Sequence, residues 1–291
     1  MSIVNAKEIM VEAAKNKYAV GAFNVTDLLQ FKAVVEAAIE TKSPVIVQTS
    51  VKPSQFIGTQ LMVNIYRTLA ESAPVPVCLH LDHCTDIEYC KKCADAGYTN
   101  IMIDASKHSF EENIRQTKEV VDYAHSVGNI SVEGELGTVG GVEDQIKVAE
   151  DEAQLANPEQ SVEFVERTGV DIFAPAIGTA HGVYKTKNPK VDFERMAKIH
   201  KLLNGSGIKT PLVVHGGTGL PDDYIVKLIE AGGAKFNVST ELKHTLIDAK
   251  WEYISAHRDE YDPGKLDVFV KDATRKAVIG WMQKLGSVGK A

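Results

Sequence analysis

The chain has little of several features that mark whole classes of proteins. Of its 291 residues only 7% are aromatic and four are cysteines, and no apolar stretch approaches the ~18 residues of a membrane-spanning helix. It has no excess of positive charge either, because 32 Lys and Arg against 39 Asp and Glu leave a net charge of −7 without any basic run. Proteins that bind nucleic acid cover phosphates with clustered cations. We therefore expect neither nucleic acid nor a membrane as a partner.

The N-terminal segment gives an expectation about location. It places Lys7, Glu8 and Glu12 in a helical pattern, where a secretory signal peptide would have an uninterrupted apolar region. A cytoplasmic protein is expected.

The four cysteines, Cys78, Cys84, Cys90 and Cys93, lie close together in the sequence. A chain this long, with 44% hydrophobic residues, can build a large core, so a disulfide framework is not expected. Cys90 and Cys93 form a C-x-x-C pair, but a structural zinc ribbon needs a second pair. We expect buried core thiols.

Short β-rich runs alternate with helical segments along the whole chain. Eight strand–helix units in about 240 residues, without a linker or a composition break, favour a single α/β domain of the (β/α)8 barrel type. We expect the barrel over about 1–240 and appended helices over about 241–291. Helix starts are predicted at Asp27, Ser109, Asn157 and Pro221. The predicted strands are 18–25, 44–50, 75–84, 100–106, 130–137, 171–178, 211–219 and 235–240.

Polar residues stand at the carboxyl ends of these strands, where barrel enzymes place their chemistry. His83, His181 and His215 come from three different strands, and three imidazoles meeting at one rim predict an open zinc site. The six other histidines are expected to be ordinary core or surface residues. Among them, His80 is three residues from His83, so the two would face opposite sides of a regular strand.

Carboxylates accompany these histidines. Glu133 and Glu135 share one face of the fifth strand and should point inward together, at a cost that a nearby metal would offset. Asp104 ends the neighbouring strand and is either a carboxylate of the metal site or an ordinary helix cap.

Two long connections, Gly137 to Asn157 and Gly182 to Pro189, follow the fifth and sixth strands. Long connections in compact domains are usually functional or disordered. Glycine-rich and hydroxyl-rich segments follow the seventh and eighth strands, where barrels commonly bind phosphate through backbone N–H groups. A phosphorylated substrate is therefore expected. These segments are His215-Gly216-Gly217-Thr218-Gly219 and Asn237-Val238-Ser239-Thr240.

Six motifs in order over nearly the whole chain resemble the class II, zinc-dependent ketose-bisphosphate aldolases, particularly the shorter branch that includes the tagatose-bisphosphate aldolases. They are HLDHC (80–84), MIDAS (102–106), SVEGELGTVGG (131–141), GTAHGVYK (178–185), VVHGGTGLP (213–221) and KFNVSTELK (235–243). The resemblance implies cleavage of a ketose 1-phosphate, such as fructose or tagatose 1,6-bisphosphate, to dihydroxyacetone phosphate and an aldehyde.

The resemblance also implies roles for individual residues. His83, His181 and His215 would hold the catalytic Zn²⁺, and Glu135 and Asp104 would lie where a displaced or second metal binds. Asp82 would be the acid/base at the C4 oxygen, and Glu143 would move the proton at carbon. A monovalent cation (Na⁺ or K⁺) near the phosphate and a homodimer or homotetramer are further expectations. The expected substrate-binding residues are Asn24, Ser50, Gly182, Lys185, Gly216, Gly217, Thr218, Asn237, Ser239 and Thr240.

The chain departs from the family pattern at one position. Many relatives read Asp-Pro-Arg in the C-terminal helices, and the arginine reaches the C6 phosphate across a subunit contact. This chain reads Asp262-Pro263-Gly264-Lys265, so the bidentate cation is absent. A substrate with another anion at C6, such as 6-deoxy-6-sulfofructose 1-phosphate, is therefore a candidate beside the bisphosphates.

Two other readings remain open from the residues alone. The first is a barrel hydrolase that uses a zinc-bound water, suggested by His80-Leu81-Asp82-His83. The second is a barrel that binds a sugar phosphate without catalysis. Zinc content and aldehyde release from a ketose 1-phosphate separate the three.

Overall fold

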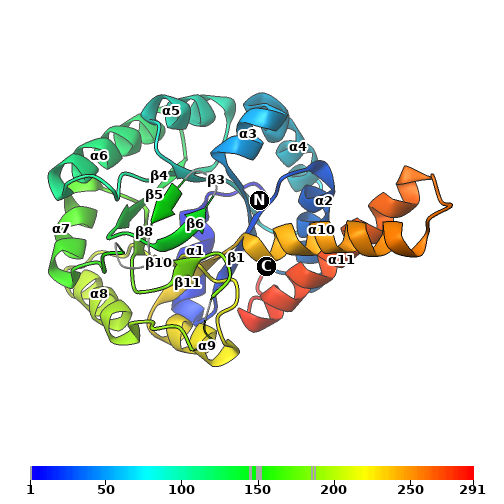
Figure 1. Cartoon of the computed structure of the whole chain (residues 1–291). Coiled ribbons are helices and arrows are strands. Elements are labelled where there is room, and N and C mark those ends of the chain that lie inside the picture. Colours follow the sequence, from blue (N-terminus) through cyan, green and yellow to red (C-terminus); the bar gives the residue numbers. More distant parts are fainter. Residues whose placement is uncertain (1, 144–145, 149–152, 185, 187) are drawn as a thin grey trace.

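The computed structural model describes residues 2–143, 146–148, 153–184, 186 and 188–291. Within this part, eight parallel strands close into a barrel, which confirms the predicted fold (Figure 1). Each strand overlaps one of the eight predicted runs. They are β1 (Val20–Asn24), β2 (Val45–Ser50), β3 (Val77–Cys84), β4 (Asn100–Ile103), β5 (Ser131–Leu136), β8 (Ile172–Pro175), β10 (Leu212–Val214) and β11 (Gly233–Val238). Around the barrel their order is β1-β11-β10-β8-β5-β4-β3-β2.

Helices surround the barrel and begin where the capping signals predict. Asp27, Ser109 and Asn157 each accept hydrogen bonds from backbone N–H groups of the first helical turn, and another helix begins directly after Pro221. The helices are α1 (Ala6–Asn16), α2 (Leu28–Thr41), α3 (Val51–Ile57), α4 (Thr59–Glu71), α5 (Ile87–Ala96), α6 (Phe110–Val127), α7 (Pro158–Thr168), α8 (Phe193–Gly205), α9 (Asp222–Glu230), α10 (Thr240–Ala256) and α11 (Pro263–Lys284).

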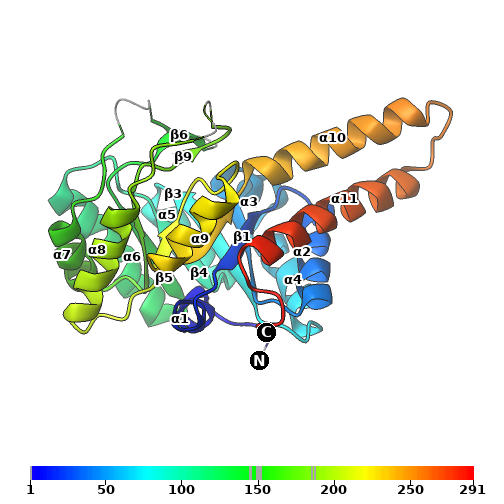
Figure 2. The same ribbon diagram turned by 90° about the horizontal axis from the view of Figure 1, so that it is seen from below.

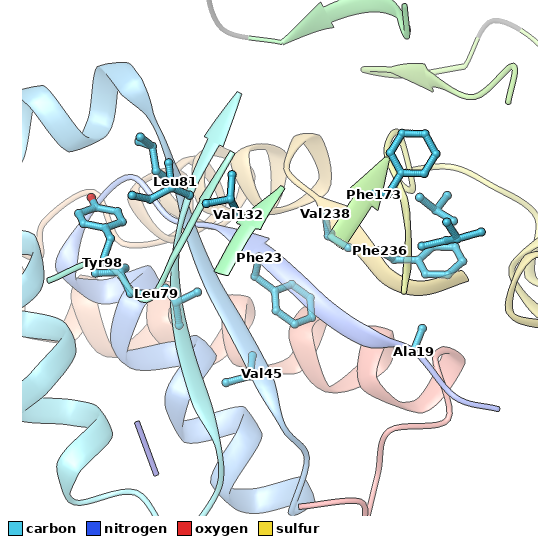
Figure 3. Close-up of a cluster of buried hydrophobic side chains, with 14 of the residues drawn as sticks. Ala19, Phe23, Val45, Leu79, Leu81, Tyr98, Val132, Phe173, Phe236 and Val238 are labelled. Atoms are coloured by element: carbon cyan, nitrogen blue, oxygen red, sulfur yellow. The ribbon is translucent and has the colours of Figure 1, made fainter. Parts of the chain in front are cut away.

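The alternation of residues along the strands builds two apolar layers. Outward-facing residues such as Phe23, Val45 and Leu79 pack between the sheet and the helices (Figure 3). Inward-facing residues such as Ala22 and Ile46 form a smaller cluster with buried residues of α1. Helix α1 thereby covers the N-terminal end of the barrel, which leaves the C-terminal end for the polar residues (Figure 2).

A second, three-stranded sheet lies over the C-terminal end of the barrel (Figure 2). It consists of β6 (Gly140–Glu143), β7 (Ile146–Val148) and β9 (Ala180–His181), so it joins the two long connections that the sequence singles out. Gly141 makes the pairing possible: its φ is +103°, and a Cβ there would lie 2.3 Å from the carbonyl oxygen of His181.

Helices α10 and α11 form a hairpin that projects away from the barrel, which confirms the predicted C-terminal extension (Figures 1 and 2). The inner part of α11 packs on α2, whereas the outer part extends beyond the other helices. No helix in the described residues is long and apolar enough to cross a membrane.

Candidate metal centre and substrate pocket

Three histidines meet at the C-terminal mouth of the barrel, as predicted. His83 is the last residue but one of β3, His181 lies in β9, and His215 directly follows β10. The ring centroids of His83 lie 4.9 Å from His181 and 4.6 Å from His215. One ligand atom from each of the three lies within 4.8 Å of the others, so the three side chains can share one metal ion.

The backbone at His83 departs from a regular strand. Its φ is +46°, in the left-handed region that few non-glycine residues adopt, and the register between β3 and β4 shifts between Leu81 and Cys84. Asp82 and His83 therefore both reach the interior of the site, although they are adjacent in the chain. The expectation that His80 and His83 face opposite sides is wrong for this reason: both belong to the buried polar interior.

Carboxylates orient two of the histidines. Asp104 lies 2.9 Å from Nδ1 of His83 and also accepts hydrogen bonds from Ser106, so it fixes the imidazole and leaves Nε2 toward the other histidines. Glu133 accepts a hydrogen bond of 2.8 Å from Nε2 of His215. Asp104 is thus a residue of the site and not a helix cap, since Ser109 caps the helix that follows.

Unpartnered atoms show that the cluster fits a metal. In the described residues, three deeply buried ligand atoms have no hydrogen-bond partner: Nε2 of His83, Nδ1 of His215 and Oε2 of Glu135. The last two lie 2.8 Å apart without the geometry of a hydrogen bond. Buried polar atoms without partners are costly, and imidazole nitrogens with carboxylate oxygens are a donor set that suits Zn²⁺. A second ligand group, His83 with Asp104 and Glu135, adjoins the first.

The electrostatics of the site favour a cation in the same place. Burial opposes the charged form of His83, but Asp82 and Asp104 outweigh it and raise its pKa well above the usual value. Burial and His83 likewise oppose charging of His215, but Glu133 and Glu135 raise its pKa. Burial would raise the pKa of Glu133, yet Lys235 and His215 hold it below its usual range. A divalent metal can take the place of the protons that these carboxylates attract.

Asp82 is held next to the metal ligands in one orientation. It is buried, and it accepts hydrogen bonds from Asn24 at 2.9 Å, Asn237 at 3.1 Å and Gln48 at 3.3 Å. These three amides come from three different strands. The carboxylate is therefore fixed at the floor of the mouth, where it can accept a proton from a bound molecule.

A pocket opens beside this carboxylate. Gly216, which lines it, has φ +69°, and a Cβ there would lie 2.4 Å from the carbonyl oxygen of Ala180, so only glycine allows this approach. Oγ of Ser239 and Oδ1 of Asn237 are buried in the described structure without hydrogen-bond partners. The pocket is lined by Asn24, Asp82, His181, Gly182, Gly216, Gly217, Thr218, Asn237, Ser239 and Thr240.

One predicted site residue does not line the pocket, and the predictions for two others fall outside the part that the structure describes. Ser50 ends β2 in register with Asp82 but is not among the residues that line the pocket. Glu143 ends β6, and its side chain lies outside the part that the structure describes, as does Lys185. The structure brings the other predicted residues together.

Sequence reasoning missed two buried residues of this site, Gln48 and Lys235. Gln48 donates to both Asn24 and Asp82, and Lys235 donates to Glu133. The alternation of side chains along a strand could have identified both residues. Gln48 lies two residues before Ser50, and Lys235 lies two before Asn237, so each shares a strand face with a predicted site residue. His80, expected to be a core residue, is fully buried between these groups, and its pKa is lowered to about 3 by burial and by Lys235.

Comparison with known proteins agrees with this geometry. The family described as fructose-bisphosphate aldolase class-II matches residues 4–290. The fructose-bisphosphate aldolase of Geobacillus stearothermophilus is 45% identical, over 100% of this chain and 99% of its own. The probable fructose-bisphosphate aldolase of Bacillus subtilis (strain 168) is 43% identical over 100% of both chains.

Solved structures show the same likeness. The YdjI aldolase from Escherichia coli K12 has a TM-score of 0.84 and 31% identity, covering 99% of both chains. A putative fructose-1,6-biphosphate aldolase from Coccidioides immitis has a TM-score of 0.88 and 31% identity, covering 98% of this chain and 97% of its own. With this family assignment, the hydrolase and non-catalytic readings fall away. The chain belongs to the class II fructose-bisphosphate aldolase family and is a lyase.

Proposed function

We propose that this aldolase depends on zinc and cleaves the C3–C4 bond of a ketose 1-phosphate, which gives dihydroxyacetone phosphate and an aldehyde. The observation that carries the proposal is the group of unpartnered ligand atoms on His83, His215 and Glu135, next to the fixed carboxylate of Asp82. Metal ligands and a proton acceptor then face the same pocket.

Residues at the mouth of the barrel would bind the metal, and neighbouring carboxylates would keep the imidazole rings from rotating. His83, His181 and His215 would bind Zn²⁺, while Glu135 and Asp104 offer oxygens to a displaced or second ion. When bound, zinc acts as a Lewis acid that stabilises negative charge developing on the oxygens of a substrate. Asp104 and Glu133 keep two of the imidazoles in the orientation that this binding needs.

Two carboxylates would move the protons. Asp82 would take the proton of the C4 hydroxyl while the C3–C4 bond breaks, and C4 would become the aldehyde carbon. The electron pair of the broken bond would pass to C3 and the C2 oxygen, which gives an enediolate. Glu143 would then deliver a proton to C3, from its place on the sheet over the mouth. Three amides hold the carboxylate of Asp82 in place, so it is already oriented for the proton transfer before the substrate binds.

The phosphate at C1 would bind where α10 begins. Ser239 caps this helix without bonding to it through its side chain, and its buried hydroxyl is unpartnered in the described structure. The N-terminus of a 17-residue helix favours an anion through its dipole and backbone N–H groups. Gly182, Gly216, Gly217 and Thr218 complete the lining there. A monovalent cation beside the phosphate stays a prediction, which activity in K⁺, Na⁺ and tetraethylammonium salts would test.

The names of the relatives and the residue at position 264 bear on the group at C6 of the substrate. The relatives' names favour fructose 1,6-bisphosphate. Yet Gly264 stands on the projecting hairpin where the family resemblance implies an arginine, and the neighbouring Lys265 is already paired with Glu260. Tagatose 1,6-bisphosphate and 6-deoxy-6-sulfofructose 1-phosphate therefore stay in the candidate set.

The direct test is release of dihydroxyacetone phosphate from these three substrates by the zinc-loaded protein, measured with a coupled assay. At least one substrate should be cleaved at C3–C4. Absence of the product from all three, with one zinc bound per chain, would contradict the proposal.

A further inference from the structure

A lysine is buried below the metal centre, although none of the proposed chemistry uses it. The side chain of Lys235 in β11 is 0% exposed, inside the barrel. Its Nζ donates a 2.7 Å hydrogen bond to Oε2 of Glu133 and lies 3.3 Å from Nε2 of His80. Burying an ammonium group costs several kcal/mol unless it is paired. A structural or functional role is therefore expected for this buried ammonium group.

Glu133 connects this lysine to a metal ligand. One carboxylate oxygen, Oε2, faces Lys235, and the other, Oε1, accepts the Nε2 proton of His215 at 2.8 Å. A neutral imidazole has one N–H and one lone pair, so donation from Nε2 leaves the lone pair on Nδ1. Nδ1 is the atom that is buried and unpartnered beside Glu135.

Lys235 fixes the orientation of the Glu133 carboxylate. It holds Oε2 at 2.7 Å, and Oε1 then lies 2.8 Å from Nε2 of His215. Without the lysine, the carboxylate would be free to rotate, and the imidazole would lose the acceptor that keeps its proton on Nε2 and its lone pair on Nδ1. The contacts of Glu133 with both neighbours therefore connect the buried lysine to the metal ligand.

We propose that Lys235 is a positioning residue of the metal centre: through Glu133 it sets the tautomer of His215 and so presents Nδ1 to the metal. The inference rests on the proposed zinc site. It differs from a plain stabilising ion pair in the barrel core, because a plain ion pair would affect folding without changing how the metal is held.

The experiment compares Lys235→Met, Glu133→Gln and the double variant in the full-length chain. Zinc affinity is measured by competition with a chromophoric chelator, and the ligand field by the visible spectrum of the Co²⁺-substituted protein. Each single substitution should weaken zinc binding by about 10- to 100-fold and alter the Co²⁺ spectrum. Because Lys235 acts through Glu133, the double variant should bind zinc no more weakly than Glu133→Gln alone.

A matched control breaks another lysine–carboxylate pair. Lys7 lies 2.9 Å from Asp171 at the opposite end of the barrel, so Lys7→Met should leave zinc affinity and the Co²⁺ spectrum unchanged. Circular dichroism checks the fold of every variant. If Lys235→Met does not fold, the double variant, which removes both charges, must still show the weaker zinc binding and the altered spectrum.

Three outcomes overturn the inference. They are native zinc affinity in Lys235→Met, an unchanged Co²⁺ spectrum, and a loss from Lys235→Met that is equally large with and without Glu133→Gln. The native chain separates this failure from that of the proposed function. If it binds zinc tightly, only the role of Lys235 is wrong, and if it binds none, the zinc site itself is wrong.

Discussion

Asp82 and Glu143 belong to parts of the molecule that are held very differently. Asp82 is fixed by amides from three barrel strands, while Glu143 ends a short strand of the covering sheet. Asp82→Ala should abolish C3–C4 cleavage, with a loss of about 10²- to 10⁴-fold, and retain some exchange of the dihydroxyacetone phosphate proton with solvent. Glu143→Ala should impair that exchange more severely.

The measurements are cleavage rates and proton exchange in D₂O, with zinc content determined for each variant. Equal loss of both activities in both variants, with zinc retained, would show that the two carboxylates do not divide the proton transfers.

At the level of single residues, the sequence predicts the site residues at the carboxyl ends of strands and misses those that lie deeper in the barrel. His83, His215 and Asp82 could be found because they follow apolar runs whose ends must meet. Lys235 could not be assigned a role from the sequence, because that role depends on its contact with Glu133. The two side chains lie 2.7 Å apart but are separated by 102 residues in the sequence. The left-handed backbone of His83 has no signal in residue type at all.

Among the elements, the sheet over the mouth connects the strand that ends at Glu143 to the strand that carries the metal ligand His181. Gly141→Ala should disrupt it, since the new Cβ would lie 2.3 Å from the carbonyl oxygen of His181 at a φ that costs ~1–2 kcal/mol for alanine. We expect kcat/KM to fall by about 10-fold or more, with little change in Tm because the barrel strands are untouched.

The control for this change is Gly280→Ala in α11, where a Cβ meets nothing within 4 Å. Steady-state kinetics and thermal unfolding of both variants test the expectation. Native kcat/KM in Gly141→Ala would mean that the covering sheet does not position catalytic groups.

The elements also show why the barrel could be predicted and its covering sheet could not. All eight barrel strands are buried, so their apolar runs stand out in the sequence. Strands β6, β7 and β9 have only two to four residues each, and their pairing depends on a glycine contact between distant loops. The helix caps were predictable because each is local, within three residues.

Over the whole molecule, the projecting hairpin presents apolar side chains that this chain does not cover. Trp251 is 71% exposed, and Ile247, Ile254, Tyr261 and Val268 are exposed near it. Such a concentration of apolar residues is typical of an interface. We expect a homodimer or homotetramer, and Trp251→Glu should shift the mass measured by light scattering toward the monomer.

The control is Val127→Glu, which places the same charge at an exposed valine on α6, outside the hairpin. It should leave the mass unchanged. A Trp251→Glu variant with the native mass at micromolar concentration would place the subunit contact elsewhere.

The hairpin also bears Gly264, at the position where the family resemblance implies an arginine. Phosphate at C6 carries nearly two negative charges and benefits from a bidentate arginine, so Gly264 should leave weak preference for C6 phosphate. Gly264→Arg should raise kcat/KM for a 1,6-bisphosphate by about 10-fold, which corresponds to ~1.4 kcal/mol of transition-state binding. A Cβ there would lie 3.2 Å from Oδ1 of Asp262, so this exposed side chain must shift by a few tenths of an ångström to accommodate the arginine.

This expectation is checked by comparing three substrates on both proteins: fructose 1,6-bisphosphate, tagatose 1,6-bisphosphate and 6-deoxy-6-sulfofructose 1-phosphate. A native enzyme that already favours a bisphosphate by orders of magnitude, and gains nothing from arginine, would show that another cation such as Arg258 or Lys265 serves the C6 phosphate.

Cleavage should depend on the zinc ion that the three histidines would hold. The measurement is activity after complete removal of zinc, verified by elemental analysis, and after its restoration, with borohydride treatment in the presence of substrate as the comparison. We predict that activity disappears without zinc, returns with one zinc per chain, and is unaffected by borohydride. Activity that survives verified zinc removal, or that borohydride destroys by trapping a lysine adduct, would show that the enzyme does not use zinc for cleavage.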